Sequence, residues 1–233
     1  MGINYFLEPA TAYVRGICES QSGYDLPDGW LRKALNDLSP AEMSDVVQFG
    51  VDAGLRLHRF KKSMGLRRVH RVLGILTSIQ PEEVLDVGSG RGAFLWPLLE
   101  TFPHLNVTSI DQSEVRAEML DAVHRGGLDR LKAHQMDATS MRFPGQSFDV
   151  VTFLEVLEHI PDPQLALNEA VRVARRFVIV SVPSKEDDNP EHIHLFSKNS
   201  LAALFNKAGV NQVNFEYVLN HMIAVANLGK AQS

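Results

Sequence analysis

The sequence has little of what several classes of protein require. Its 233 residues contain a single cysteine, Cys18, which excludes an intramolecular disulfide and a cysteine-based metal cluster. It contains no apolar run as long as a membrane span, so we expect no membrane partner. The N-terminal MGINYF lacks the basic start and apolar core of a signal peptide, and Phe6 stands where myristoylation needs serine or threonine. These absences favour a cytoplasmic protein.

Charge is modest in sum and uneven along the chain. The net charge of -5 argues against a protein that coats nucleic acid. Between Asp52 and Glu82, however, no acidic residue occurs, and residues 56–71 carry seven arginines and lysines. Such a stretch is typical of a solvated helix face with one cation reaching a cofactor carboxylate, or of a site for an anionic substrate. Nucleic acid is the less favoured partner, because Phe60 is the only phenylalanine, tyrosine or tryptophan in this stretch, which leaves little to stack on a base.

The first third of the chain has a helical pattern. Ser39, Pro40 and Glu42 form the signature of a capping box with proline at the first helical position. We expect this helix to end at Gly65. Apolar residues at helical spacing predict a further helix over residues 66–79.

After residue 80 strand-like and helical segments alternate, which indicates a parallel sheet wrapped by helices. A link too short for a crossover joins the last two strand-like runs, so the last strand should be antiparallel. The expected fold is therefore α/β and doubly wound, with a mostly parallel seven-stranded sheet and a helical N-terminal cap. The expected strands are 83–87, 106–110, 131–136, 148–153, 177–182, 210–218 and 221–228, and the expected helices are 92–101, 113–125, 163–173 and 197–208.

Three glycines in five positions follow the first expected strand. In a doubly wound sheet, ligands bind at the carboxyl ends of the strands, where the strand order reverses. Gly88, Gly90 and Gly92 allow the backbone to fold under such a ligand, and the next helix points its N-terminus at it. Asp111 ends the second strand, where a carboxylate can accept two hydrogen bonds from a ribose diol.

Three details favour S-adenosylmethionine (SAM) over a dinucleotide. The third glycine falls at Gly92, which gives G-x-G-x-G. Asp86 precedes the first glycine by two residues, where it either binds the cofactor or orders the loop. Asp137 follows the third strand and can receive an adenine amino group. Asp111 and Asp137 also suit helix N-caps, a role that does not exclude binding.

Four stretches carry a family resemblance. VLDVGSGRGAF, SIDQSEV, MDATSMRFPGQSFDVVTFLEVLEHIPDP and HLFSKNSLAALFNKAGV resemble successive motifs of class I SAM-dependent methyltransferases, over about residues 66 to 227. The resemblance implies a Rossmann-type fold with SAM as cofactor. It also implies cofactor contacts from Gly88, Ser89, Gly90 and Gly92 at the methionine part, Asp111, Gln112 and Ser113 at the ribose, Asp137 and Ala138 at the adenine, and Glu155 near the methionine end.

The stretch EVLEHIPDP follows the fourth strand, next to the place where the strand order reverses. His159 there can take a proton from an attacking hydroxyl or amine, or it can order the loop through a hydrogen bond. An already reactive nucleophile needs only alignment, without a base.

A divalent metal is the alternative at the same stretch. Glu155, Glu158 and His159 form E-x-x-E-H, and His192 and His194 lie further on. This set resembles the metal site of small-RNA 3'-terminal ribose methyltransferases, although E-x-x-E-H also occurs in metal-free small-molecule enzymes. We expect no metal, and we assign Glu158, His192 and His194 to the substrate side.

The sequence therefore predicts a helical extension over residues 1–65 and a SAM-binding core over residues 66–233. The predicted activity is methyl transfer to an oxygen or nitrogen of a small molecule. The alternatives are a metal-dependent RNA ribose methyltransferase and a methyltransferase-like protein that binds SAM or a partner without catalysis. Residues 1–38 should fold over the active site, because their apolar side chains need a surface to pack against.

Overall fold

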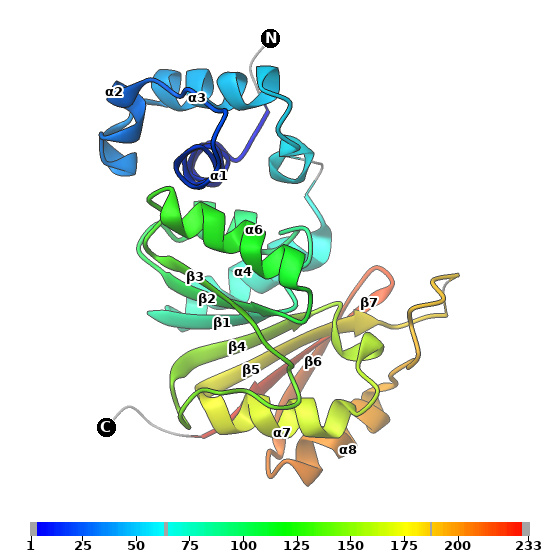
Figure 1. Cartoon of the computed structure of the whole chain (residues 1–233). Helices are drawn as coiled ribbons and strands as arrows, with labels where there is room; N and C mark the ends of the chain where they lie inside the picture. Colours follow the sequence, from blue (N-terminus) through cyan, green and yellow to red (C-terminus); the bar gives the residue numbers. More distant parts are fainter. Residues whose placement is uncertain (1–3, 63–64, 187, 230–233) are drawn as a thin grey trace.

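One seven-stranded sheet organises the molecule (Figure 1). The computed structural model describes residues 4–62, 65–186 and 188–229. The strand order is β3-β2-β1-β4-β5-β7-β6. The strands are β1 (Glu83–Val87), β2 (Asn106–Asp111), β3 (Leu131–Gln135), β4 (Phe148–Leu154), β5 (Ala174–Pro183), β6 (Gln212–Val218) and β7 (His221–Asn227).

The sheet has the predicted direction pattern. Strands β1 to β5 pair in parallel, whereas β7 runs antiparallel to both β5 and β6. The chain moves outward from β1 to β3 and then returns to β4 on the other side of β1. The strand order therefore reverses at β1 and β4, and their carboxyl ends mark the expected ligand site.

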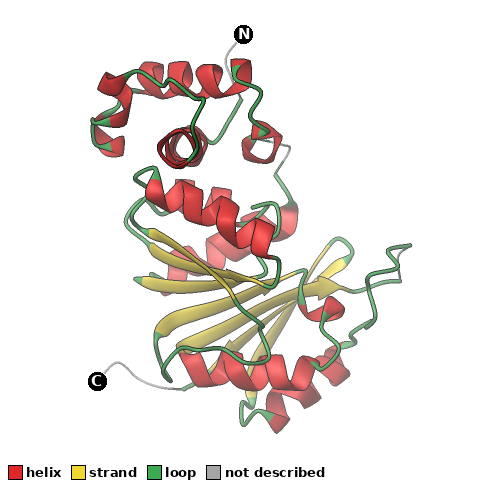
Figure 2. Cartoon of the chain, in the orientation of Figure 1, coloured by secondary structure: helices red, strands yellow, loops and turns green. Residues whose placement is uncertain are grey.

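Helices cover both faces of the sheet (Figure 2). One core cluster includes Leu76, Leu98 and Leu120 from three helices on one face, and a second includes Leu167 and Leu201 from two helices on the other. Coverage on both faces explains why the inner strands are apolar almost throughout. The helices of the first face are α4 (Arg67–Ile79), α5 (Leu95–Thr101) and α6 (Glu114–Arg125), and those of the second are α7 (Pro163–Val173) and α8 (Lys198–Lys207).

The N-terminal region forms a third layer, outside α6. Figure 1 shows α1, α2 and α3 on the side of α6 that faces away from the sheet. The Ser39–Glu42 capping box is confirmed at the start of α3. The elements of this layer are α1 (Leu7–Ser20), α2 (Asp28–Leu31), α3 (Pro40–Asp52) and two short 3-10 helices, η1 (Leu35–Asp37) and η2 (Leu57–Phe60).

Two expectations about this region are wrong. The helix that begins at Ser39 ends at Asp52, well before Gly65, because Gly54 adopts a φ of +81° and Leu55 N–H bonds back to the Gly50 carbonyl. In addition, the described part of residues 1–38 does not line the cleft at the carboxyl edge of the sheet.

Close helix packing explains why residues 1–38 lie elsewhere. A Cβ on Gly16 of α1 would stand 1.9 Å from the Ala122 carbonyl oxygen of α6, and one on Gly126 would stand 1.7 Å from the Ala12 oxygen. Small residues on both helices thus allow the two backbones to touch. The apolar side of α1 is buried against α6 and α3, so it is not available to cover the active site.

Candidate active site

A cleft of about 740 Å³ opens at the carboxyl ends of β1, β2 and β4. It lies where the strand order reverses, as the sequence predicts. Eight residues singled out from the sequence line it: Gly88, Gly90, Asp111, Gln112, Asp137, Ala138, Glu155 and His159.

The loop after β1 contains Gly88, Gly90 and Gly92, and we call it the glycine loop. Gly88 and Gly90 line the cleft. Gly88 has a φ of +70°, and a Cβ there would stand 2.6 Å from the Val156 side chain. Gly90 has a φ of +57°, and its N–H donates to Asp111 at 3.2 Å. Both positions require glycine for the backbone conformation, and Gly88 also requires it for space.

A hydrogen bond between Asp86 in β1 and Ser89 in the loop fixes the loop to the sheet. Asp86 is 2% exposed and accepts hydrogen bonds from the hydroxyls of Ser89 and Thr152. Burial raises the pKa of Asp86 to about 6, and the two hydrogen bonds oppose that rise. Ser89 also shares a hydrogen bond with Ser109. Asp86 therefore orders the loop through hydrogen bonds from hydroxyl groups.

Gly92 faces away from the cleft. A Cβ there would stand 2.1 Å from Nε1 of Trp96 in α5, and the φ of Gly92 is +81°. The indole N–H of Trp96 donates to the carbonyls of Arg59 and Arg91. Gly92 lines a separate cavity, so its requirement for glycine comes from packing against Trp96 and from its positive φ.

Asp111 joins the glycine loop to the start of α6. Its Oδ1 accepts from the Ser113 N–H at 2.9 Å, and its Oδ2 lies 3.4 Å from Nη1 of Arg116. Ser113 therefore acts through its backbone. The sequence analysis missed Arg116, which lines the cleft; its position in the first turn after Asp111 was the available signal.

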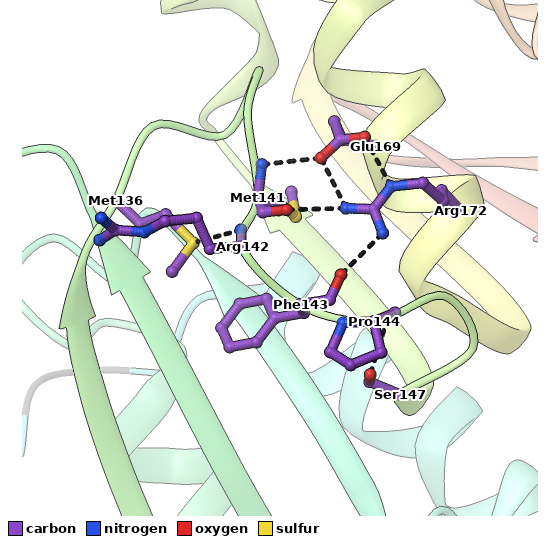
Figure 3. Close-up of polar contacts among 8 residues, drawn as sticks. All are labelled: Met136, Met141, Arg142, Phe143, Pro144, Ser147, Glu169 and Arg172. Atoms are coloured by element: carbon purple, nitrogen blue, oxygen red, sulfur yellow. Dashed lines mark hydrogen bonds and ion pairs between the residues drawn. The ribbon is translucent and has the colours of Figure 1, made fainter.

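The loop after β3 carries Asp137 and Ala138, the two residues that the resemblance implies for the adenine. Asp137 Oδ1 accepts from the N–H and the hydroxyl of Thr139, both at 2.8 Å. Figure 3 shows how α7 fixes the continuation of this loop: Glu169 accepts from Met141 N–H at 2.7 Å, and Arg172 donates to the carbonyls of Met141 and Phe143. The Glu169–Arg172 pair thus holds the loop against α7.

Glu155 follows β4 in a backbone conformation that is rare for residues other than glycine, with a φ of +59°. Its carboxylate accepts a hydrogen bond from Ser181 Oγ at 2.7 Å. It also lies 3.0 Å from Nε2 of His221 and 3.6 Å from Nε of Arg68. Arg68 belongs to the basic stretch. His221 gave no signal in the sequence, because its approach to Glu155 depends on β7 lying beside β5.

Glu158, His159 and His192 lie together. Each offers one ligand atom within 4.8 Å of the others, so they form a set that can hold a metal ion. The two other residues of the proposed metal set lie elsewhere: Glu155 makes the contacts described above, and His194 Nε2 donates to the Ile160 carbonyl at 3.0 Å. Three of the five candidates thus converge. The expectation that no metal is needed stays a prediction.

His159 has a defined proton arrangement. Its Nδ1 lies 2.8 Å from the carbonyl oxygen of Glu191. A carbonyl only accepts, so Nδ1 carries the hydrogen and the neutral ring keeps its lone pair on Nε2. His159 lines the cleft, and this nitrogen can take a proton or bind a metal.

The sheet order, the antiparallel last strand and the glycine loop define a class I Rossmann-like methyltransferase fold. Residues 85–180 match the methyltransferase domain family, from within β1 to within β5. This segment of the chain is a methyltransferase domain.

Known proteins are similar to parts of this chain. The chain is 29% identical to the 27-O-demethylrifamycin SV methyltransferase of Amycolatopsis mediterranei over 59% of this chain and 54% of the relative. It is 31% identical to the demethylmenaquinone methyltransferase of Thermotoga maritima over 58% and 51%. It therefore spans about half the length of these relatives. A SAM-dependent methyltransferase structure from Aquifex aeolicus shares the fold, with a TM-score of 0.55 and 20% identity over 72% of this chain and 100% of the other.

Proposed function

We propose that the chain binds SAM in the cleft and transfers its methyl group to an oxygen or nitrogen of a small molecule. One observation carries the proposal: the glycine loop and the two strand-end acids, Asp111 and Asp137, line a single cleft. The family match and the shared fold support SAM as the cofactor. The names of the two curated relatives, which refer to a rifamycin and a menaquinone, support a small-molecule acceptor.

The charge of the cleft favours SAM over a dinucleotide. Among the described residues that line it, Arg116 is the only arginine or lysine. SAM carries a sulfonium and an ammonium against one carboxylate, so its net charge is positive, whereas the pyrophosphate of a dinucleotide is repelled by acids. The acidic lining residues are Asp111, Asp137, Glu155, Asp162 and Glu191.

SAM supplies an electrophilic methyl group, whose transfer leaves S-adenosylhomocysteine. The residues of the cleft position the reactants and accept the proton of the acceptor. His159 suits that second role, because its Nε2 keeps a lone pair while Nδ1–H is fixed by the Glu191 carbonyl. Glu155, held by Ser181 and His221, fixes the end of β4 beside the cleft.

Two experiments test this proposal. Calorimetry should detect binding of SAM and S-adenosylhomocysteine and no binding of NAD; tight NAD binding without a response to SAM would overturn it. Incubation with methyl-labelled SAM and fractionated extract should label a small-molecule fraction. SAM binding without label uptake in any fraction would favour the alternative of a protein that binds SAM without catalysis.

A metal-dependent ribose methyltransferase is the second candidate function. The convergence of Glu158, His159 and His192 favours it, whereas the separate contacts of Glu155 and His194 do not. We expect activity to survive chelation, and we expect the purified protein to contain no stoichiometric divalent metal. Metal that is removed together with activity, and a loss of metal in His192→Gln, would establish the second candidate.

The division of the chain is also a proposal. We propose a helical extension over residues 1–65 and a core over residues 66–233. Support comes from α4, which packs in the helix layer next to the sheet, while α1 to α3 lie outside that layer. Across the residues that the structure describes, no helix is long and apolar enough to cross a membrane. The cytoplasmic location stays a prediction.

A further inference from the structure

A second cavity lies behind the glycine loop, bounded by η2, α4 and α5. Its volume is about 720 Å³, close to that of the cofactor cleft. Leu66, Val69, Leu73, Trp96 and Pro97 give it an apolar wall. The function proposed above makes no use of this cavity.

The polar residues of the cavity are almost all basic. Arg59, Lys61, Lys62 and Arg91 line it together with two histidines, and Glu100 is the only acid among the described lining residues. Glu100 pairs with Lys62 at 2.5 Å. Within the described part of the chain, no ion pair neutralises Arg59, Lys61 or Arg91. Three cationic residues therefore line one cavity without a matching acid.

The cations of the basic stretch, residues 56–71, differ in whether they have an acidic partner. Arg68 and Arg71, which lie outside the cavity, face acids of the core, Glu155 and Glu216. Of the cations that line the cavity, only Lys62 has such a partner, although the chain as a whole carries a net charge of -5. Like charges held close together raise the local potential and attract an anion from solution.

We propose that this cavity binds a phosphorylated small molecule with an apolar body. Three cations that line one cavity are more than the single carboxylate of a ligand would neutralise, and a phosphate dianion accepts several charge-assisted hydrogen bonds at once. The apolar wall around Trp96 can cover the rest of such a ligand. This inference does not depend on methyl transfer.

The two tryptophans of the chain provide the measurement. The indole N–H of Trp96 donates to the carbonyls of Arg59 and Arg91, at 3.0 and 3.2 Å, so its NMR signal reports on the cavity. Trp30 lies in α2 and is the internal control. Phenyl phosphate should shift the Trp96 signal and leave the Trp30 signal unchanged. No shift of Trp96, or equal shifts of both signals, would overturn the proposal.

Two further probes measure separately how much the charge and the apolar body of the ligand contribute to binding. Inorganic phosphate, which lacks the ring, should bind about tenfold more weakly than phenyl phosphate. Benzyl alcohol, a neutral molecule of similar size, should also bind about tenfold more weakly. Equal affinity of either probe and phenyl phosphate would contradict a site that uses both features, and this comparison needs no variant.

The double variant Arg59→Gln/Lys61→Gln should weaken phenyl phosphate binding about tenfold or more. Arg67→Gln is the matched control, because Arg67 is exposed in the same stretch and does not line the cavity. Its effect should stay below about twofold. Thermal unfolding checks that both proteins are folded. An equal loss in both variants would overturn the proposal in favour of a diffuse basic surface, such as one that binds an extended polyanion.

Discussion

Two cavities of similar size adjoin one glycine loop and differ in charge. The cleft of about 740 Å³ is lined by five acids and Arg116, whereas the cavity of about 720 Å³ behind the loop is lined by four arginines and lysines and Glu100. Volume alone would assign similar ligands to both. Their charges instead suit a cationic cofactor on one side and an anion on the other.

The loop between them is shared, although its glycines serve different sides. Gly88 and Gly90 line the acidic cleft, and Gly92 lines the basic cavity against Trp96. A regular G-x-G-x-G spacing thus contains two kinds of requirement: a positive φ at Gly88 and Gly90, with room beside Val156, and room for a buried indole at Gly92.

The largest effect should come from Gly92→Ala. The new Cβ would meet the indole of Trp96, which is 1% exposed and cannot turn away, at a position with a φ of +81°. Overpacking and the strained backbone together should lower the free energy of unfolding by about 3–4 kcal/mol. Denaturant unfolding measures this loss.

Gly209→Ala is the control for Gly92→Ala. Gly209 also has a positive φ, +84°, and a Cβ there would meet nothing within 4 Å. Its cost should be near the backbone contribution alone, about 1 kcal/mol. If Gly92→Ala is as stable as Gly209→Ala and loses only SAM affinity, Gly92 belongs to the cleft and the division of the loop is wrong.

The next effect is a pH dependence caused by Asp86, below the loop. Burial raises its pKa to about 6, from about 3.9 in an unfolded chain. The folded state therefore binds more protons between these values, so stability should fall as pH rises from about 4 to 6, by up to about 3 kcal/mol. Asp86→Asn should remove this slope in denaturant unfolding at several pH values. An unchanged slope, with Asp121→Asn as surface control, would show that other groups cause it.

The sequence predicted the sheet well because its signals are local. The boundaries of β1 were predicted without error, since an apolar run bounded by Glu83 and the glycines is unambiguous. The antiparallel β7 followed from the short link after β6. The helix from Ser39 was predicted too long, because apolar residues continue at helical spacing past Gly54. The helical backbone ends before that glycine, which has a positive φ.

The site could be predicted only in part. Asp111 and Asp137 end or follow strands, so the fold fixes their place at the edge of the sheet. The partners of Glu155 could not be predicted: Arg68 approaches from α4 and His221 from β7, and both contacts depend on tertiary packing. The error over residues 1–38 has the same cause. Their apolar side chains can pack against the active-site edge or against a helix of the core, and the sequence does not distinguish the two surfaces. The close contact of Gly16 with α6 shows that they pack against the helix.

A smaller effect is expected from Asp111→Ala in the acidic cleft. The variant should weaken SAM binding by about 1.5–3 kcal/mol, as for a lost hydrogen bond to a charged group. Calorimetry measures the change, and phenyl phosphate binding behind the loop should not respond. Asp121→Asn is again the surface control, because Asp121 pairs with Arg125 away from the cleft. Equal losses for SAM and phenyl phosphate would mean that the two cavities are not independent.

The smallest effect should come from Arg116→Ala, which removes the one arginine among the described residues that line the cleft. Its guanidinium lies 3.4 Å from Asp111 and its side chain is 51% exposed, so the pair is worth less than about 1 kcal/mol. Without it the cleft is more negative. SAM, which is cationic, should then bind slightly more tightly, while S-adenosylhomocysteine, which lacks the sulfonium charge, should bind as before. Calorimetry at low salt resolves the difference, and Arg125→Ala is the matched control. If both ligands bind more weakly, Arg116 contacts the cofactor itself, and the charge of the cleft is not what selects it.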